Sequence, residues 1–503
     1  MVMYRMYKSL SNVYIIGFVL VCVIYFTTAY NSHGFYHADE HYQIIEFAGL
    51  KSGTHSAEEL AWEFKAQIRP MLQPSICFIV FNVLDTIKIR DPYTQAFVLR
   101  MLSAILALII ISSFIKQTIN SIADINAKRA YCLLSFCMWF IPFISVRFSS
   151  ETWSGLLFLL SLTIYLNPEH PKLRPYLLGI VLGLSFLFRF QIAFAFIGFF
   201  LWILFFDRKP LPFWIKTGML FLCILFMGFL IDAWYYGEWV FSPWNYFHVN
   251  IINNAASDFG TSPWYYYIVK FIRFPGYPIG ILLLISFIIL TLLKPSNPFI
   301  WCLFFFVLFH SFIAHKEERF IFPLVYLFPM MMVSAYQELS LFVKNRFAFL
   351  LLNYILVSLL IFSNSIGLLA MGYKSAGIGR MEITRYIHKE SKSDRINLIY
   401  CSWANPYNPW HSLPMKFYHE QCMKEKRINS LCELNDSMLI PHAKNFLIIR
   451  KADLGNPQCN TCLTSNHFIF VKQSIPPWIE QLSKIYGDFD CQNILELYEY
   501  GKQ

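Results

Sequence analysis

Charged side chains are scarce in this chain of 503 residues, where Asp, Glu, Lys and Arg make up 14% of the sequence. A soluble domain of ordinary composition is about one quarter charged. Hydrophobic residues make up 56%, and Phe alone occurs 51 times, which is more apolar surface than a soluble core could bury. Runs at 93–115, 177–206 and 346–370 are long enough to cross a bilayer, which takes about 20 helical residues. The composition therefore indicates an integral membrane protein.

Long basic runs are also absent, although the net charge is +10, so we expect no nucleic-acid partner. Lys and Arg instead collect in short loops between apolar runs, as on the cytoplasmic side of membrane proteins. With the N-terminus in the cytoplasm, about eleven spans place these basic loops inside and the chemically richer loops outside. The predicted spans are 13–29, 93–115, 130–147, 151–166, 176–190, 191–206, 214–233, 277–294, 298–314, 320–337 and 346–370.

Two apolar runs have alternative interpretations. The run 13–29 follows a short basic stretch, as in a signal peptide, but no convincing cleavage site follows it, so we predict an uncleaved span. The run 72–89 is interrupted by Asp85 and Lys88, so we predict a short or dipping segment. If it crosses the membrane fully, the sidedness of everything after it inverts.

The spans predict a transmembrane domain at 1–370, with a large first outside loop at 30–92, and a soluble outside domain at 371–503. Strand-like runs separated by Pro, Asn and Gly turns predict a small α/β fold for the latter. These runs are 396–400, 445–449 and 467–471. No internal repeat and no low-complexity segment is present.

The C-terminal domain holds six of the twelve cysteines, at positions 401, 422, 432, 459, 462 and 491. An even number in an outside domain favours disulfides, whose pairing the sequence leaves open. Cys459 and Cys462 form a Cys-x-x-Cys pair that could instead be redox-active or bind a metal. Asn435-Asp436-Ser437 is a glycosylation sequon, which is consistent with an outside position.

Two adjacent carboxylates, Asp39 and Glu40, lie about ten residues beyond the first span and are flanked by His37 and His41. A carboxylate in a partly desolvated cleft has a raised pKa, which suits it to accept a proton from a sugar hydroxyl. One alternative is a solvated loop, or a helix that Asp39 caps. Another is a metal site, if His37 and His41 lie one turn apart on a helix.

A second group of ionisable side chains lies in a tight outside turn with the sequence His-Lys-Glu-Glu-Arg-Phe at 315–320. Three of these side chains can be cationic, which suits a lipid-linked phosphate, and Arg can bind phosphate through two hydrogen bonds. Charged side chains that snorkel at helix ends are the alternative. Arg147 and Glu151 bracket another tight turn, and Arg189 lies within an apolar run, where a charge is costly unless it is paired.

Two outside segments combine aromatic rings with polar groups, as carbohydrate sites do. Aromatic rings also form interfacial belts, but a belt does not need the acids and amides found among them. The first segment contains Trp62, Glu63 and Arg69, and the second contains Asp232, Tyr236, Asn245, Asn250 and Trp264.

Together these motifs resemble the Alg9-like family of dolichyl-phosphate-mannose-dependent α-mannosyltransferases, glycosyltransferase family 22. The resemblance covers about 30–376, and the motif at 315–320 is its most specific part. The other motifs that carry it are His-x-Asp-Glu-x-x-Gln at 37–43, Trp-Glu at 62–63 with Arg69, and the segments 232–237, 245–250 and 260–264. Within the family, Cys401-x-x-x-x-Pro-Tyr, His411-x-Leu-Pro-Met415-x-Phe and Cys422 resemble the members that add the third mannose of a GPI anchor.

The resemblance implies an α-helical polytopic protein with the GT-C fold in the endoplasmic reticulum membrane, with a lumenal active site. The implied reaction transfers mannose from dolichyl (polyprenyl) phosphate mannose to a lipid-linked glycan, a GPI-anchor precursor, with inversion. Asp39 would deprotonate the acceptor hydroxyl, with Glu40 supporting or replacing it. The leaving phosphate needs no protonation. No metal and no cofactor are implied, and the partners are the bilayer, the lipid-linked donor and a glycolipid acceptor.

The resemblance also assigns expected roles to the motif residues. We expect His315, Lys316, Glu318 and Arg319 to bind the donor phosphate. The residues expected to contact substrate are Trp62, Glu63, Arg69, Arg147, Glu151, Arg189, Asp232, Tyr236, Asn245, Asn250 and Trp264.

Two other functions remain open from the sequence. A bacterial GT-C enzyme of the inner membrane could glycosylate a periplasmic or cell-wall glycan with the same donor chemistry. A lipid or glycan transporter would also explain many spans with buried charge, but it predicts repeated halves and helices broken at the midplane, and the sequence shows neither.

Overall fold

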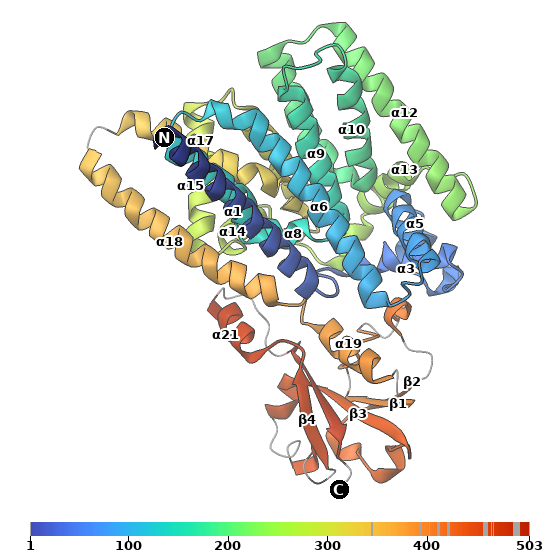
Figure 1. Cartoon of the computed structure of the whole chain (residues 1–503). Coiled ribbons are helices and arrows are strands. Elements are labelled where there is room, and N and C mark those ends of the chain that lie inside the picture. The colour runs from blue at the N-terminus through green and yellow to red at the C-terminus, as the bar shows by residue number, and fades with distance from the viewer. Residues whose placement is uncertain are drawn as a thin grey trace. The chain divides into compact units, whose positions relative to one another are not determined.

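The computed structural model (Figure 1) describes residues 2–503 except 344–345, 392–394, 402, 410–412, 420–422, 456–460, 464, 466, 486–492 and 502–503. The motif positions His411, Cys422, Cys459 and Cys491 therefore lie outside the described residues. The chain forms two compact units. Unit 1 contains 1–29, 66–76 and 99–369, and unit 2 contains 30–65, 77–98 and 370–503.

Unit 1 is built from apolar helices. Each predicted span falls on one or two of them, which confirms the helical polytopic fold. The helices are α1 (Val2–Asn31), α6 (Pro92–Thr118), α7 (Ile125–Cys137), α8 (Phe140–Ser145), α9 (Ser150–Leu166), α10 (Arg174–Phe188), α11 (Ala193–Trp202), α12 (Leu211–Tyr236), α15 (Tyr277–Leu293), α16 (Pro298–Phe312), α17 (Phe328–Phe342) and α18 (Arg346–Tyr373).

Some of these helices are long and apolar enough to cross a membrane, and the others are shorter. Within the described residues, five helical stretches are long and apolar enough to cross a membrane: 92–121, 190–207, 211–236, 318–342 and 350–373. The pair α15 and α16, bent by 118° at its break, would count as a sixth if it were one span. Leu222, Phe226 and Met227 on α12 are each more than half exposed, as is typical of a helix face that contacts lipid.

Close helix packing in unit 1 depends on small residues. The Cβ of an alanine at Gly155 on α9 would lie 2.4 Å from the Pro323 carbonyl oxygen of the 3₁₀ helix η7 (Glu318–Leu327). A Cβ at Gly198 on α11 would lie 2.2 Å from the Trp301 carbonyl oxygen of α16. Small residues at helix contacts in membranes let backbones approach in this way.

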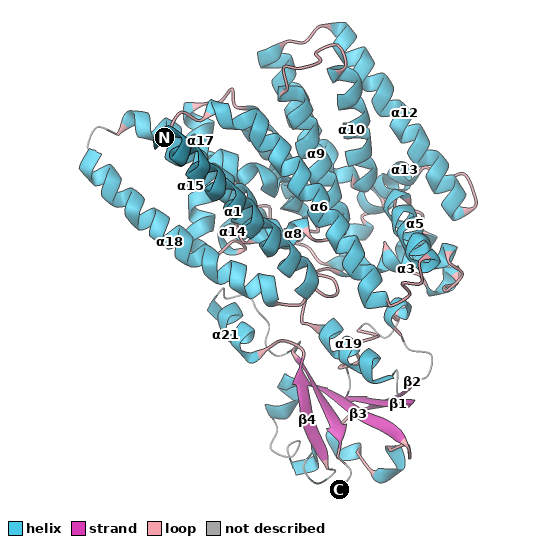
Figure 2. Cartoon of the chain, viewed as in Figure 1, coloured by secondary structure: helices cyan, strands magenta, loops and turns pink. Residues whose placement is uncertain are grey.

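Unit 2 contains the strands (Figure 2), which form one five-stranded sheet in the order β2-β1-β3-β5-β4. Strand β1 is parallel to β2 and β3, and β5 is antiparallel to β3 and β4. The strands are β1 (Arg395–Cys401), β2 (Met423–Ile428), β3 (Ala443–Arg450), β4 (Phe468–Gln473) and β5 (Leu495–Tyr500), and the main helices are α19 (Arg380–Ser391) and α21 (Pro477–Ile485). The α/β prediction for the tail is confirmed.

The first outside loop belongs to the same unit as the tail. It contributes the short helices α2 (Ala38–Tyr42), α3 (Ile45–Lys51) and α4 (Trp62–Lys65). The Tyr42 hydroxyl donates to the Leu413 carbonyl at 2.8 Å, and the Ala376 N–H donates to the His33 carbonyl at 2.8 Å. Our division at residue 370 placed this loop with the transmembrane domain instead, because such long-range hydrogen bonds leave no local pattern in a sequence.

The interrupted apolar run at 72–89 forms α5 (Leu72–Thr86). Its 15 residues span about 22 Å, less than the roughly 30 Å hydrocarbon core of a bilayer. Its C-terminal part belongs to unit 2, where Phe81 stacks on Phe417 with ring centroids 5.0 Å apart. The helix is therefore short, as the interruption by Asp85 and Lys88 indicates.

Candidate functional site

The first-loop acids lie in the first turn of α2. His37 is the N-cap residue, and its ring nitrogen accepts a hydrogen bond from the Asp39 N–H at 3.4 Å. The Asp39 carboxylate lies 3.5 Å from the same ring nitrogen, and the Glu40 carboxylate accepts a hydrogen bond from the Tyr36 N–H at 3.3 Å. The capping alternative for Asp39 was wrong, because His37 occupies the N-cap position of α2.

Glu46, on α3, is a buried carboxylate that the sequence analysis did not select. His41 lies 2.6 Å from one of its oxygens, and His55 hydrogen-bonds the other. Burial alone would raise the pKa of Glu46, but the two imidazoles outweigh that effect and lower its pKa to about 2. His41 therefore pairs with a carboxylate, whereas His37 caps a helix. No cluster of three His, Cys, Asp or Glu side chains that could hold a metal ion is found in the described part of the chain.

The other predicted first-loop residues in unit 2 lie on α4. Glu63 is buried and accepts a hydrogen bond from the Gln43 amide at 2.8 Å. The Trp62 side chain is 38% exposed. Glu63 thus fixes the loop, while the neighbouring indole remains accessible to a ligand.

The charged residues of unit 1 converge on Glu151. One of its carboxylate oxygens lies 2.7 Å from Arg189 and 2.9 Å from Arg319, and all three side chains are almost fully buried. A buried charge is tolerated only when it is paired, so the two guanidinium groups and this carboxylate stabilise one another. The structure therefore brings together three residues that lie far apart in the sequence.

The turn at 315–320 extends this group. Arg319 also donates to Glu317 at 2.5 Å, and His315 lies 2.8 Å from the second oxygen of that carboxylate. Lys316 donates to the carbonyls of Ser262 and Ile313, at 2.8 and 2.5 Å.

The charge on Lys316 has no direct counterion. No carboxylate among the residues that the structure describes pairs with its ammonium group. Desolvation lowers the pKa of Lys316. Glu318 forms a salt bridge with Lys270 at 2.8 Å.

The chain places these side chains at helix ends. Glu151 follows the N-cap Ser149 of α9, Arg189 is the extended C-cap of α10, and Glu317 precedes η7. Helix ends leave backbone groups without helical partners, so polar side chains gather there at lower cost than within a span. Arg147, in the link between α8 and α9, is also buried and lies over the Phe143 ring.

A second group in unit 1 joins segment 66–71 to α12 and the short helix α13 (Ser242–Phe247). Asp232 accepts hydrogen bonds from the Met71 N–H at 2.8 Å and the Ser242 hydroxyl at 2.5 Å. The Tyr236 hydroxyl donates to the Arg69 carbonyl at 2.9 Å. In this structure these side chains hold the backbone, and a direct role in binding remains a prediction.

The remaining predicted residues of this region differ in exposure and contacts. The Asn245 amide donates to the Gln67 carbonyl, and the Asn250 amide donates to the Tyr246 carbonyl one turn earlier, both at 3.3 Å. Trp264 is 68% exposed. The Tyr246 ring lies under Arg69, and its hydroxyl accepts a hydrogen bond from Gln191, two residues after Arg189, so the second group adjoins the charged one.

Comparison with known proteins identifies relatives for most of the chain. The profile of the Alg9-like mannosyltransferase family matches residues 16–420. "GPI alpha-1,2-mannosyltransferase 3" of Danio rerio is 24% identical over 57% of this chain and 53% of its own length. "GPI mannosyltransferase 3" of Candida albicans is 25% identical over 61% of each chain. The chain thus matches little more than half the length of these curated relatives.

A solved structure shows a similar fold. The crystal structure of ArnT from Cupriavidus metallidurans, bound to undecaprenyl phosphate, has a TM-score of 0.50 at 10% identity and covers 97% of this chain and 99% of its own. ArnT is a GT-C membrane glycosyltransferase, so this likeness confirms the predicted fold. Since the family profile covers most of the sequence, the chain belongs to the Alg9-like mannosyltransferase family.

Proposed function

We propose that the chain transfers a mannosyl group from a polyprenyl (dolichyl) phosphate to a lipid-linked glycan, with inversion, on the lumenal side of the endoplasmic reticulum membrane. The observation that carries this proposal is the buried pairing of Arg189 and Arg319 with Glu151. Lys316 adds a third buried cation three residues before Arg319. Membership of the Alg9-like mannosyltransferase family supports the sugar and the donor class.

The group has hydrogen-bonding capacity left for a phosphate. A guanidinium carries five N–H donors. Arg189 donates to Ser150 and to one oxygen of Glu151, and its buried Nε has no hydrogen-bond partner among the described residues. Glu151 and Glu317 thus hold the guanidinium groups in place. Because Lys316 is desolvated without a direct counterion among the described residues, an incoming phosphate would restore the preference of its amine for the charged form.

The first-loop acids supply the base in this proposal. Asp39 takes the proton from the acceptor hydroxyl, which attacks the anomeric carbon of a β-linked mannosyl phosphate from the opposite face. The bond to the phosphate oxygen breaks as the new bond forms, and the product is an α-mannoside. The phosphate leaves as an anion, which Arg319 and Lys316 stabilise. No metal or cofactor takes part.

An assay of membranes supplied with labelled dolichyl phosphate mannose and a glycolipid acceptor tests both parts. We expect Asp39→Asn to lower kcat by about 100-fold or more, as loss of a general base does, with the donor KM unchanged. Lys316→Gln and Arg319→Gln should raise the donor KM by roughly 10- to 100-fold, because each loses charged hydrogen bonds to phosphate.

Arg129→Gln is the matched control, since Arg129 is an exposed basic residue of a predicted cytoplasmic loop. It should leave both constants unchanged. Full activity of Asp39→Asn would remove Asp39 as the base. A normal donor KM in both cation variants would remove the phosphate site.

We further propose that the acceptor is a GPI-anchor precursor, because relatives in several species carry the name GPI mannosyltransferase 3. Expression of this chain in cells that lack that activity should restore GPI-anchored proteins at the cell surface. A relative from Schizosaccharomyces pombe that matches only 19% of the chain is named for a dolichyl-diphosphate oligosaccharide acceptor instead. Failure to restore the anchors, with transfer to such an oligosaccharide in vitro, would replace the GPI acceptor with that class.

A further inference from the structure

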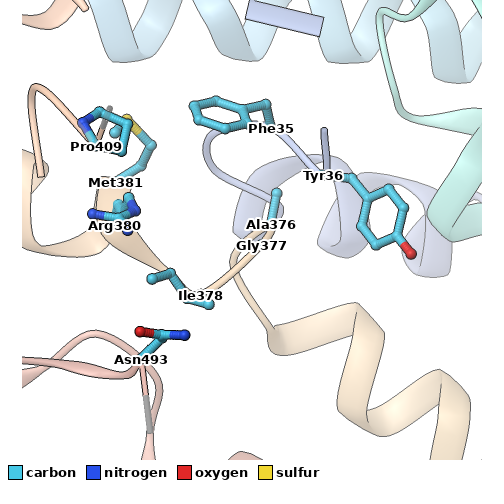
Figure 3. A pocket seen from close by; sticks show the side chains of 9 residues that line it. All are labelled: Phe35, Tyr36, Ala376, Gly377, Ile378, Arg380, Met381, Pro409 and Asn493. Atoms are coloured by element: carbon cyan, nitrogen blue, oxygen red, sulfur yellow. The ribbon is translucent and has the colours of Figure 1, made fainter. Parts of the chain in front are cut away.

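A cavity of about 290 Å³ lies within unit 2, between the start of the first loop and the tail (Figure 3). Phe35 and Tyr36 line it from the loop, and Arg380, Pro409 and Asn493 line it from the tail. The Phe35 ring points toward Met381 and Pro409, whereas the Tyr36 ring points to the other side. The lining of the cavity thus combines two aromatic residues with one cationic side chain, that of Arg380.

Arg380, the first residue of α19, gives the cavity its charge. Its guanidinium donates to the Asn405 carbonyl at 3.2 Å, and no carboxylate pairs with it among the residues that the structure describes. Burial lowers the pKa of Arg380 to about 10, so the side chain is still cationic at neutral pH. Glu382, on the same helix, is already paired with Lys472 at 2.9 Å.

The chain keeps the wall of this cavity open and fixed in position. Gly377 lines it with a φ of +61°, and a Cβ there would lie 3.1 Å from the Phe35 carbonyl. Phe35 is in turn stacked on His41, with ring centroids 5.6 Å apart, and His41 pairs with Glu46. A partly buried arginine at the wall of a cavity can bind a phosphate or carboxylate through two hydrogen bonds.

The cavity is also tied to the first-loop acids. Tyr36, on its wall, donates its backbone N–H to Glu40 at 3.3 Å. Asp39 is three positions after Tyr36, so their Cα atoms lie at most about 11 Å apart. The wall of the cavity thus lies close in the chain to the acid that we propose as the base.

We propose that this cavity binds a phosphate ester of the acceptor glycolipid, with Arg380 on the phosphate and Phe35 against a sugar face. The inference rests on the proposed mannosyl transfer and adds the acceptor class, an anionic glycan. The phosphate can be a substituent on the glycan or the diester that joins the glycan to its lipid. The tail thereby becomes a specificity element of the enzyme.

Two glycolipid acceptors that differ only in a phosphoryl substituent on the glycan test this inference with the full chain. Arg380→Gln should raise the KM for the phosphorylated acceptor by about 10-fold or more, with the donor KM unchanged, and Arg380→Lys should restore part of the loss. If the phosphate is the glycan substituent, the unsubstituted acceptor should be insensitive to Arg380→Gln. If the phosphate is the diester, Arg380→Gln should raise the KM for both acceptors equally. The KM for an acceptor with an uncharged linkage to lipid should then be insensitive to Arg380→Gln.

Two further variants distinguish loss of acceptor binding from loss of the fold. Ile378→Trp fills the cavity without removing charge and should also raise the acceptor KM. Arg427→Gln, an exposed arginine on β2, should change nothing. Unchanged acceptor constants in both Arg380→Gln and Ile378→Trp would overturn the inference. Absence of mannosyl transfer by the wild-type chain to any acceptor would instead refute the proposed function.

Discussion

At the scale of single residues, Glu46 ties the ionisation of one carboxylate to the stability of unit 2. Its pKa falls from an ordinary 4.5 to about 2 in the folded chain. Folding therefore gains free energy from Glu46 at any pH above about 4.5, and this gain is lost as the pH falls toward 2. The gain is on the order of 3 kcal/mol.

The pH dependence of thermal unfolding in detergent measures this coupling. We expect Glu46→Gln to lower the Tm at pH 7, and the difference from the wild type to shrink steadily as the pH falls from 5 toward 3. Asp258→Asn, at an exposed acidic residue of unit 1, is the control and should run parallel to the wild type. A Tm difference that stays constant with pH would mean that Glu46 acts through packing alone.

Single residues also show where the sequence is a limited guide. The pattern around Asp39 and Glu40 identified the acids, but not that His37 caps their helix. Asp232 and Tyr236 stand out among aromatic residues, yet their contacts hold backbone. Glu46 escaped selection because its partners His41 and His55 lie five and nine residues away, at no regular spacing. Pairing of this kind depends on tertiary structure.

At the scale of elements, the contact between α9 and η7 positions the charged group. Gly155 lies one turn after Glu151 on the same face of α9, and it allows the backbone of η7 to approach. That approach brings Arg319, the second residue of η7, within 2.9 Å of Glu151.

Gly155→Ala should therefore disturb both stability and donor binding. A Cβ 2.4 Å from the Pro323 oxygen forces α9 and η7 apart, at a cost of about 1–3 kcal/mol, and we expect a lower Tm with a raised donor KM. Gly218→Ala is the matched control within α12, where no atom lies within 4 Å of the added carbon, and it should be neutral or slightly stabilising. Equal effects of the two substitutions would contradict the close-approach argument.

Among the strands, β1, β3 and β4 were predicted from the sequence, whereas β2 and β5 were not. β1 and β3 are apolar and buried, as is typical of central parallel strands. β2 was missed because its sequence Met-Lys-Glu-Lys-Arg-Ile carries charge on an edge strand, where exposed charges discourage further pairing. β5, with the sequence Leu-Glu-Leu-Tyr-Glu-Tyr, was missed as well.

At the scale of the whole molecule, the sidedness of the spans can be tested at the Asn435 sequon. Asn435 and Ser437 are exposed in unit 2, so nothing in the fold blocks modification. If the tail is lumenal, the chain made in the endoplasmic reticulum should carry a glycan that endoglycosidase removes. Asn435→Gln should abolish the shift in gel mobility, and Asp436→Glu, which keeps the sequon, should retain it.

Protease protection supplies the second readout for sidedness. The tail should resist protease added to intact microsomes and should be digested once detergent opens them. An unmodified tail that protease cleaves in intact microsomes would invert the proposed orientation.

About eleven spans were predicted, and five helical stretches within the described residues, or six if α15 and α16 form one span, are long and apolar enough to cross a membrane. The helical fold class followed from the sequence because apolar runs are local signals. The composition of unit 2 could not be predicted from the sequence. This unit joins residues 30–65 to the tail through hydrogen bonds and ring contacts between positions far apart in the sequence. The same limit applies to the cavity beside Tyr36, whose lining comes from both ends of the chain.

Because the first loop and the tail belong to one unit, the order of synthesis determines when this unit can fold. Residues 30–65 leave the ribosome about 340 residues before their partners around 405–418, an interval of roughly 20–70 s at ordinary rates of translation. Throughout that interval, His41, Tyr42 and Glu46 lack the tail residues that cover them. The nascent chain thus carries an unfinished first loop until synthesis is nearly complete, and this makes it a natural client for chaperones of the compartment in which it folds.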